Sequence, residues 1–310
     1  MSIAREQSLY SGYASGSLTT LRRDLAQLQE QIGTGKRINR PSDDPTGFAQ
    51  ARTLEALEQR YDQYNRTIGS ARLWTDRTQS ALDGLAERFA EAHEKGLQGL
   101  NDTNSQDERN VLADRIDAIL GEVIDGLNAK SGSEYLFGGT RTTTPPLQED
   151  GTLTGSDNVP PDPVITVDDL TGERKREIAP GVTVTINVSG KDVLQSGSDY
   201  TIVDSLKNLA AALRGEVDDP DLQTAVAQVE VSRDHLIERG ADAGNVASRL
   251  TLAETQIADA TIETASRRSA IEDADYYDVV QRFQSAQTAL EAALRTTASV
   301  SQTTLLDYLR

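Results

Sequence analysis

Residues 54–92 read LEALEQRYDQYNRTIGSARLWTDRTQSALDGLAERFAEA, and this stretch decides the fold. Apolar or small side chains recur every three or four positions, a spacing that places them on one face of an α-helix. The positions are Leu54, Leu57, Tyr61, Tyr64, Ile68, Ala71, Thr75, Thr78, Leu82, Leu85, Phe89 and Ala92. A helix of this span is about 58 Å long, far longer than an ordinary globular helix. The stretch therefore predicts a helical rod.

Further helices accompany this one. Ser105 and Glu108 have the spacing of a capping box, and the short connection before them predicts a helix that folds back antiparallel. Helical spacing returns near residue 205 and, after Asp221, continues past two glycines to Ile257. We expect residues 46–140 and 205–270 to form the N-terminal and C-terminal parts of the rod.

Residues 141–204 differ in character. Proline pairs interrupt any helix, and three stretches predict strands: 164–167, 182–188 with strict alternation, and 200–203. We expect a small, projecting β-rich insertion with a thin core. The fold class is therefore mainly α with a β-rich insertion, in which the N- and C-terminal segments form a long antiparallel helical rod or coiled coil.

Apolar seams also occupy both ends of the chain. Residues 1–45 contain a heptad helix and a turn, in which Gly33 and Gly35 stop the helix and Pro45 opens the next one. Residues 271–310 contain the last helix. Because nothing adjacent in sequence covers these seams, they must pack on each other or on another subunit, which indicates assembly. The seam residues are Leu18, Leu21, Leu25, Leu28 and Ile32 at one end, and Val279, Phe283, Ala286, Leu290 and Ala293 at the other.

The composition excludes several classes of function. There are 49 acidic residues against 31 lysines and arginines, a net charge of −18, which argues against binding nucleic acid or an anionic membrane. With no cysteine, there is no disulfide, thiol nucleophile or cysteine-based zinc site. No run of about 18 apolar residues occurs, and residues 1–9 do not resemble a secretory signal.

Motifs for chemistry are also missing. The two histidines, His93 and His235, lack metal-ligand spacing, and residues 33–36 lack the remaining positions of a phosphate-binding loop. The acidic clusters 43–44 and 272–275 are better explained as helix-start acids and a charged surface than as a cation site. We expect no catalytic site, no cofactor and no bound metal.

Two motifs carry a family resemblance. Residues 35–45, GKRINRPSDDP, resemble the N-terminal turn of the flagellin superfamily, and residues 271–276, IEDADY, resemble its C-terminal motif. Within the superfamily, the chain is most similar to the hook-associated junction proteins. The features are the two prolines of 41–45, the segment YLFGGT at 135–140 and the terminus LLDYL at 305–309.

The resemblance implies a structural adaptor. Its terminal helices would form an inner coiled coil and assemble as a ring, with the other hook-associated protein on the hook side and flagellin on the filament side. It also implies an export chaperone, type III export as an uncleaved chain, and an extracellular location in the bacterial flagellum. Besides the seams above, the expected interface includes Arg37, Asp43, Asp44, Ile271, Asp273, Asp275 and Leu306. By charge complementarity, we expect the basic Lys36, Arg37 and Arg40 to meet acids of a neighbour such as Asp273 or Asp275.

Other functions stay open at this point. The chain is also consistent with a main or minor flagellin of the filament. A soluble coiled-coil signalling protein fits the helices but not the insertion, and an enzyme would have to use the insertion as its catalytic domain.

Overall fold

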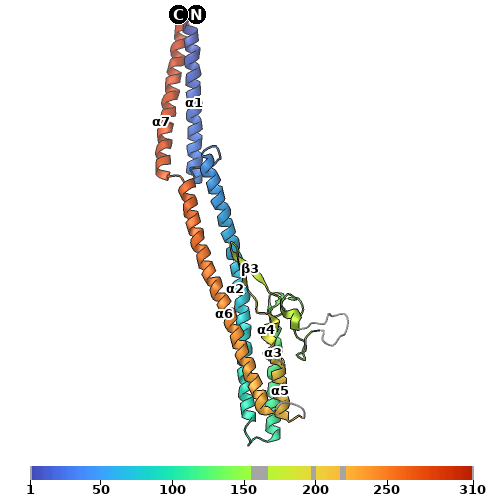
Figure 1. Ribbon diagram of the computed structural model, residues 1–310. Helices are drawn as coiled ribbons and strands as arrows, with labels where there is room; N and C mark the ends of the chain where they lie inside the picture. The colour runs from blue at the N-terminus through green and yellow to red at the C-terminus, as the bar shows by residue number, and fades with distance from the viewer. Residues whose placement is uncertain (1, 155–166, 197–199, 217–220, 309–310) are drawn as a thin grey trace. The chain divides into compact units, whose positions relative to one another are not determined.

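The computed structural model describes residues 2–154, 167–196, 200–216 and 221–308, with side chains described only between residues 16 and 298 (Figure 1). The chain divides into two compact units. We call residues 1–60 with 259–310 the terminal unit, and residues 61–258 the central unit. No described helix is both long enough and apolar enough to cross a membrane.

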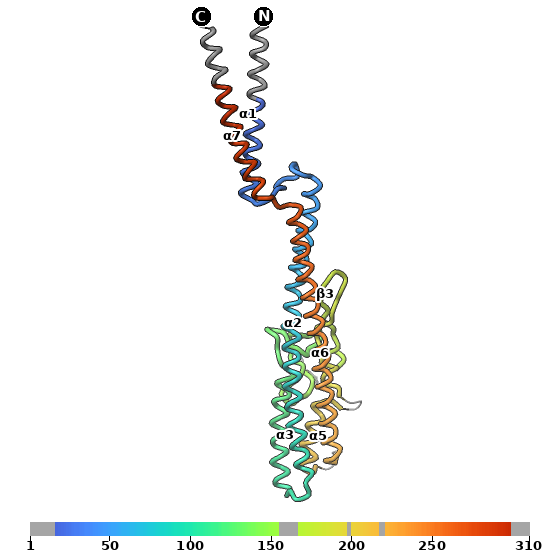
Figure 2. Tube along the Cα trace, turned by 90° about the vertical axis from the view of Figure 1, so that its left-hand side faces the viewer, coloured from blue at the N-terminus to red at the C-terminus, as the bar shows by residue number. Residues whose placement is uncertain are grey.

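The central unit is built on helices that run side by side (Figures 1 and 2). They are α3 (Gln106–Leu127), α5 (Ile202–Arg214), and the parts of α2 (Pro45–Gly99) and α6 (Leu222–Glu272) that lie in this unit. Along α2, every predicted seam position from Ile68 to Ala92 is buried, including Thr75 and Thr78. The prediction of a long helix with one buried face is therefore confirmed.

The helix ends follow local chemistry. Ser105 accepts a hydrogen bond from the Glu108 backbone N–H, and Glu108 accepts one from the Ser105 N–H, so the predicted capping box is present. The Ser105 N–H and the Ser105 hydroxyl both donate to the Glu108 carboxylate, and these two bonds hold its pKa below the ordinary value. The α3 helix packs antiparallel on α2, where Arg115 Nη2 lies 2.6 Å from Glu91 Oε1.

Short strands and turns lie between α3 and α5, and we call this whole segment the insertion, which begins before residue 141. The first hairpin pairs β1 (Lys130–Ser131) with β2 (Glu134–Tyr135), and the second pairs β3 (Lys175–Ala179) with β4 (Val182–Thr185), both antiparallel. A 3₁₀ turn, η1 (Val167–Leu170), and a short helix, α4 (Gly190–Leu194), complete it. The predicted strand at 182–188 is confirmed as far as Thr185, whereas residues 164–166 lie outside the described part of the chain.

The prediction of a strand at 200–203 is wrong. Thr201 instead caps α5: its hydroxyl accepts from the Asp204 N–H, and Asp204 accepts from the Thr201 N–H. Ile202 and Val203 are buried as the first residues of that helix. A capping box satisfies two backbone donors at once, and this outweighs the β propensity of the two branched side chains.

The insertion shares its core with the helices. Its buried residues Leu136, Phe137, Leu170, Ile178, Val184 and Ile186 belong to the same hydrophobic cluster as the α2 and α3 seams. Arg174 fixes this packing, because its guanidinium lies 4.1 Å from the centroid of the Trp74 ring and its Nη2 lies 2.9 Å from Glu134 Oε2. The insertion is thus docked on the helices of the central unit.

In the terminal unit, α1 (Ser2–Thr34) lies alongside α7 (Tyr276–Tyr308), antiparallel to it (Figures 1 and 2). Gly35, with φ +72°, ends α1, as its position in the sequence predicts. The first turns of α2 and the last turns of α6 belong to the same unit.

Candidate assembly interface

The two family motifs meet in the terminal unit. Lys36 and Asp273 form an antiparallel bridge, and the Arg37 N–H donates to the Glu272 carbonyl at 2.7 Å. The Ala274 N–H donates to the Gly35 carbonyl at 2.9 Å. Segments from opposite ends of the chain are therefore joined by backbone hydrogen bonds, with Ile38 buried beside them.

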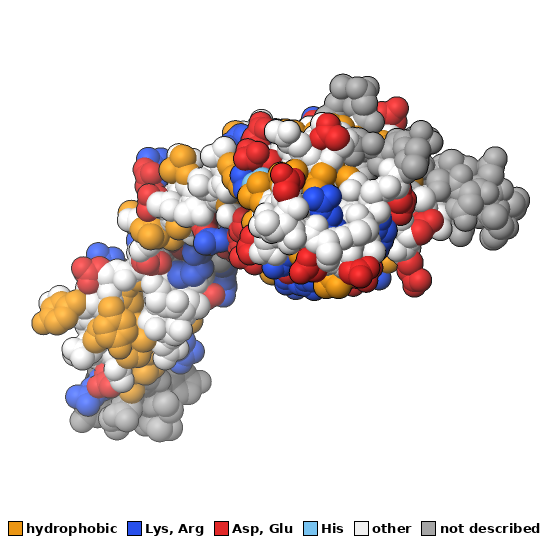
Figure 3. All heavy atoms as spheres, turned by 90° about the horizontal axis from the view of Figure 1, so that it is seen from below, with side chains coloured by type: hydrophobic (Ala, Val, Ile, Leu, Met, Phe, Trp, Pro, Cys, Tyr) orange, Lys and Arg blue, Asp and Glu red, His pale blue; other side chains and the backbone are white. Residues whose placement is uncertain are grey.

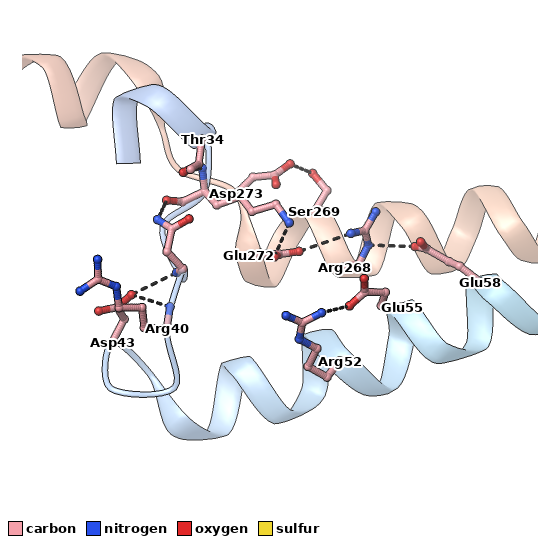
Figure 4. A network of polar contacts seen from close by, with 12 residues as sticks. Thr34, Arg40, Asp43, Arg52, Glu55, Glu58, Arg268, Ser269, Glu272 and Asp273 are labelled. Atoms are coloured by element: carbon pink, nitrogen blue, oxygen red, sulfur yellow. Dashed lines mark hydrogen bonds and ion pairs between the residues drawn. The ribbon is translucent and has the colours of Figure 1, made fainter. Parts of the chain in front are cut away.

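A chain of charges runs through this junction (Figure 4). Lys36 Nζ lies 2.6 Å from Glu272 Oε1. The other carboxylate oxygen of Glu272, Oε2, lies 3.5 Å from Arg268 Nη1. Arg268 Nε in turn lies 3.0 Å from Glu58 Oε1. The two carboxylates are only 15% and 17% exposed, so water screens these pairs less than ordinary surface pairs. The network ties the N-terminal turn to the end of α6 and the start of α2.

The predicted acids of the N-terminal turn serve the turn itself. Asp43 Oδ2 accepts from the N–H groups of Asn39 and Arg40, at 3.0 and 2.9 Å. Asp44 Oδ1 accepts from the Gly47 N–H at 2.9 Å and caps α2, in front of Pro45. Both carboxylates thus shape the connection between α1 and α2.

The charged residues predicted to contact a neighbouring subunit have partners within the chain. Arg37 Nη2 donates to the Ile271 carbonyl at 2.8 Å, and Arg37 lies 3.7 Å from Asp44. Asp273 accepts from the Ser269 hydroxyl, and Asp275 accepts from the Tyr277 N–H, which caps α7. Arg37 therefore does not need an acid of a neighbouring subunit to be paired, although its intersubunit contact stays a prediction.

The two seams are only partly covered in the single chain. Leu18, Leu21, Leu25, Leu28 and Ile32 are half-buried, as are Ile271, Phe283, Ala286, Leu290 and Ala293. Val279 is the one fully buried seam residue described. Leu306 lies in α7, but its side chain is outside the described ones. A two-helix pair leaves each seam an open flank that further helices can cover.

Sequence reasoning missed the charge chain. Glu58 and Arg268 lie more than 200 residues apart in sequence. The sequence around a surface charge does not indicate which residue will pair with it. Nothing in the described part of the chain groups three or more histidines, aspartates or glutamates as a metal site would require. Hydrogen bonds and ion pairs hold the two motif segments together, so the charged side chains there stabilise the fold of the terminal unit.

Comparisons with known proteins match this architecture. The family model for the bacterial flagellin N-terminal helical region matches residues 11–142, and the model for the C-terminal helical region matches residues 217–309. Flagellar hook-associated protein 3 of Salmonella typhimurium is 24% identical over 94% of both chains, and that of Escherichia coli is 25% identical over 93% of this chain and 94% of its own.

A solved structure shows the same fold. The flagellar hook-associated protein-3 of Legionella pneumophila is 13% identical and superimposes with a TM-score of 0.59, covering 71% of this chain and 98% of its own. The two family models together account for the helical ends on both sides of the insertion. The chain therefore belongs to the bacterial flagellin family and is a structural component of the flagellum, not an enzyme.

Proposed function

We propose that this chain is the hook–filament junction protein, which forms a ring between the hook and the flagellin filament. One observation carries the proposal: its curated relatives are named flagellar hook-associated protein 3 and align with it over nearly their whole length. On the hook side it would contact the other hook-associated protein, and on the filament side the first flagellin subunits. It would leave the cell through the flagellar export apparatus, escorted by a chaperone.

The half-buried seams supply a mechanism. Full burial of a leucine contributes about 1.5–3 kcal/mol, so a half-buried one gains roughly half of that when a neighbour covers it. With four half-buried leucines and the half-buried Ile32 on α1 alone, assembly would gain enough apolar burial to offset the cost of ordering the chain ends. The terminal helices would gain this burial only in the ring. Their final ordering would therefore occur as the subunit is incorporated.

A deletion strain tests the function. Cells lacking the chain should build hooks without filaments and lose flagellin monomers into the medium, as electron microscopy and immunoblotting of the medium would show. Hooks that still carry normal filaments would reject the proposal and favour a minor filament subunit.

Complementation tests the mechanism. The seam variants Leu21→Asp and Leu290→Asp should fail to restore filaments, because each places a carboxylate where apolar packing is required. Thr20→Asp is the matched control, since Thr20 is exposed and lies beside the seam. Restoration by the seam variants would contradict the mechanism, and failure of the control would show that the assay reads any new charge on α1.

A further inference from the structure

A cavity lies in the central unit, between the insertion and α6. Its volume is 310 Å³, at the lower end of the range of about 300–1,000 Å³ that is typical of ligand pockets. The insertion contributes residues 171–173, 185–189 and 192 to the lining, and α6 contributes residues 239, 242, 243 and 246. A cavity of this size takes one long side chain together with the backbone that carries it.

Hydrogen bonds between side chain and backbone fix the cavity walls. Asn187 Nδ2 donates to the Gly172 carbonyl at 2.8 Å, and Asn187 Oδ1 accepts from the Arg174 N–H at 2.7 Å. His235 Nε2 lies 2.5 Å from the carbonyl oxygen of Asp192, which ties α4 to α6. Because the walls are already in place, little free energy is lost in ordering them when a partner binds.

Part of the lining is apolar. Ile186 and Ala243 are buried, and Val188 and Val246 are partly buried against the core of the central unit. The methylene chain of a lysine or an arginine can lie on such a surface while its charged end stays in contact with water.

The rest of the lining is acidic, and one of its carboxylates is left for a ligand. Asp242 pairs with Arg239 at 2.9 Å, and Glu173 pairs with Lys175 at 2.8 Å. The Asp192 carboxylate makes no hydrogen bond or ion pair with any residue that the structure describes. A cation in the cavity would therefore gain a partner at Asp192 without displacing another one.

The cavity also contains an open strand edge. Lys175 and Thr185 face each other in the β3–β4 ladder, and the Ile186 N–H donates to the Arg174 carbonyl at 2.9 Å. This pattern makes Lys175 and Thr185 a non-hydrogen-bonded pair, so the N–H and C=O of Thr185 turn away from β3. Among the described residues, no further strand pairs with β4. An open edge of this kind can add an extended chain as a further strand.

The charge of the central unit favours a basic partner. The unit contains 34 acidic and 18 basic residues, a net charge of −16, and Figure 3 shows acidic side chains spread over its surface. Three carboxylates and one guanidinium line the cavity itself. This field attracts cations and disfavours anions, including the carboxylate of a free amino acid.

We propose that the cavity binds an extended segment of a partner protein that carries a lysine or an arginine. The backbone of the segment would pair with Thr185, the stem of its basic side chain would lie on Val188 and Val246, and the charged end would meet Asp192. This inference goes beyond the junction role and does not depend on it, because every residue that carries it lies in the central unit.

A peptide titration tests the site. The blocked pentapeptide TVKVT, added to the isotope-labelled full chain, should shift the amide NMR signals of Thr185, Val188 and Ala243. The neutral peptide TVQVT should bind up to about fivefold more weakly, which is the range of an exposed ion pair. Equal affinity for both peptides, or no shift with either, would overturn the proposal. Free lysine that binds as tightly as TVKVT would also overturn it, because the occupant would then be a small molecule.

Two variants test the two parts of the contact. Asp192→Asn should weaken the binding of TVKVT by up to about fivefold and leave that of TVQVT unchanged. Asp234→Asn is the matched control, because it removes a carboxylate of α6 that is 62% exposed and lies outside the cavity lining. Equal losses with both variants would assign the effect to overall charge and overturn the site.

Thr185→Pro should abolish the binding of both peptides, because proline removes an N–H that β3 does not use. Undiminished binding at an unchanged melting temperature would overturn the pairing with the strand edge. If the variant melts at a lower temperature, Asp192→Asn decides alone. The deletion strain tests the junction function separately, so the two proposals can fail independently.

Discussion

Replacing Arg174 by methionine should loosen the insertion from the helices of the central unit. The Arg174 guanidinium stacks over the Trp74 ring and pairs with Glu134, and the side chain is only 16% exposed. Methionine keeps most of the apolar stem but removes the charge and the donors. The variant Arg174→Met therefore isolates the polar part of this contact.

Two contributions set the size of the effect. A cation over an aromatic ring in a partly desolvated site contributes about 1–2 kcal/mol. The ion pair adds at most about 1 kcal/mol, because the Glu134 side chain is 39% exposed and solvent screens it. A total of about 2 kcal/mol lowers the melting temperature of a unit this size by roughly 4–8 °C.

Trp74 reports the change directly, because it is the only tryptophan. Its fluorescence followed through thermal and urea unfolding should show the lower midpoint and a shifted native emission. Lys175→Met is the matched control, because it removes a neighbouring cation whose side chain is 60% exposed. Its free energy of unfolding should stay within about 0.5 kcal/mol of that of the natural chain, so its midpoint should hardly move. An Arg174→Met midpoint equal to the control's would refute the reasoning.

Three further predictions concern stability. Phe89→Ala should lower the free energy of unfolding by about 3–5 kcal/mol in a urea titration, because Phe89 is fully buried; a loss under 1 kcal/mol would contradict its place in the core. The Arg174 hydrogen bond lowers the pKa of Glu134, so the stability from this pair is present above the unfolded pKa and lost as pH falls through the folded one. The melting temperature should thus fall more steeply in acid for the natural chain than for Glu134→Gln. Gly35→Ala should speed amide exchange at Arg37 and Ile38, because a residue with a side chain pays about 1–2 kcal/mol at φ +72°. Unchanged exchange would contradict this cost.

The long helices could be predicted from sequence because their pattern is redundant. Twelve seam positions on α2 repeat the same spacing, and those from Ile68 onward are all buried. The helix ends were equally readable at Ser105, at Asp44 with Pro45, and at Gly35. Each of these signals is local, so no knowledge of distant residues was needed.

The insertion was less predictable, because its strands are short and compete with other local preferences. Residues 130–135 form a hairpin of two-residue strands, too short to show alternation. At residues 201–204 the capping signal Thr201 and Asp204 was present, yet the neighbouring Ile202 and Val203 suggested a strand. The thin core expected for the insertion also differs from the structure, where its apolar residues join the helical core.

The interface could be predicted only in part. Seam spacing predicted which residues of α1 and α7 pack together, and that pairing stays a prediction. The two motifs marked the two connecting segments that the structure joins by backbone hydrogen bonds. The partners of Lys36, Arg37 and Arg268 could not be inferred, because each contacts a residue that only the fold brings near. Charge complementarity within one chain and between chains looks the same in a sequence.

The position of the chain in the flagellum tests the central proposal most directly. Antibodies raised against the purified chain, coupled to gold particles, should label intact flagella by electron microscopy at one site only, where the filament meets the hook. Label along the whole filament would contradict the junction role and identify the chain as a filament subunit.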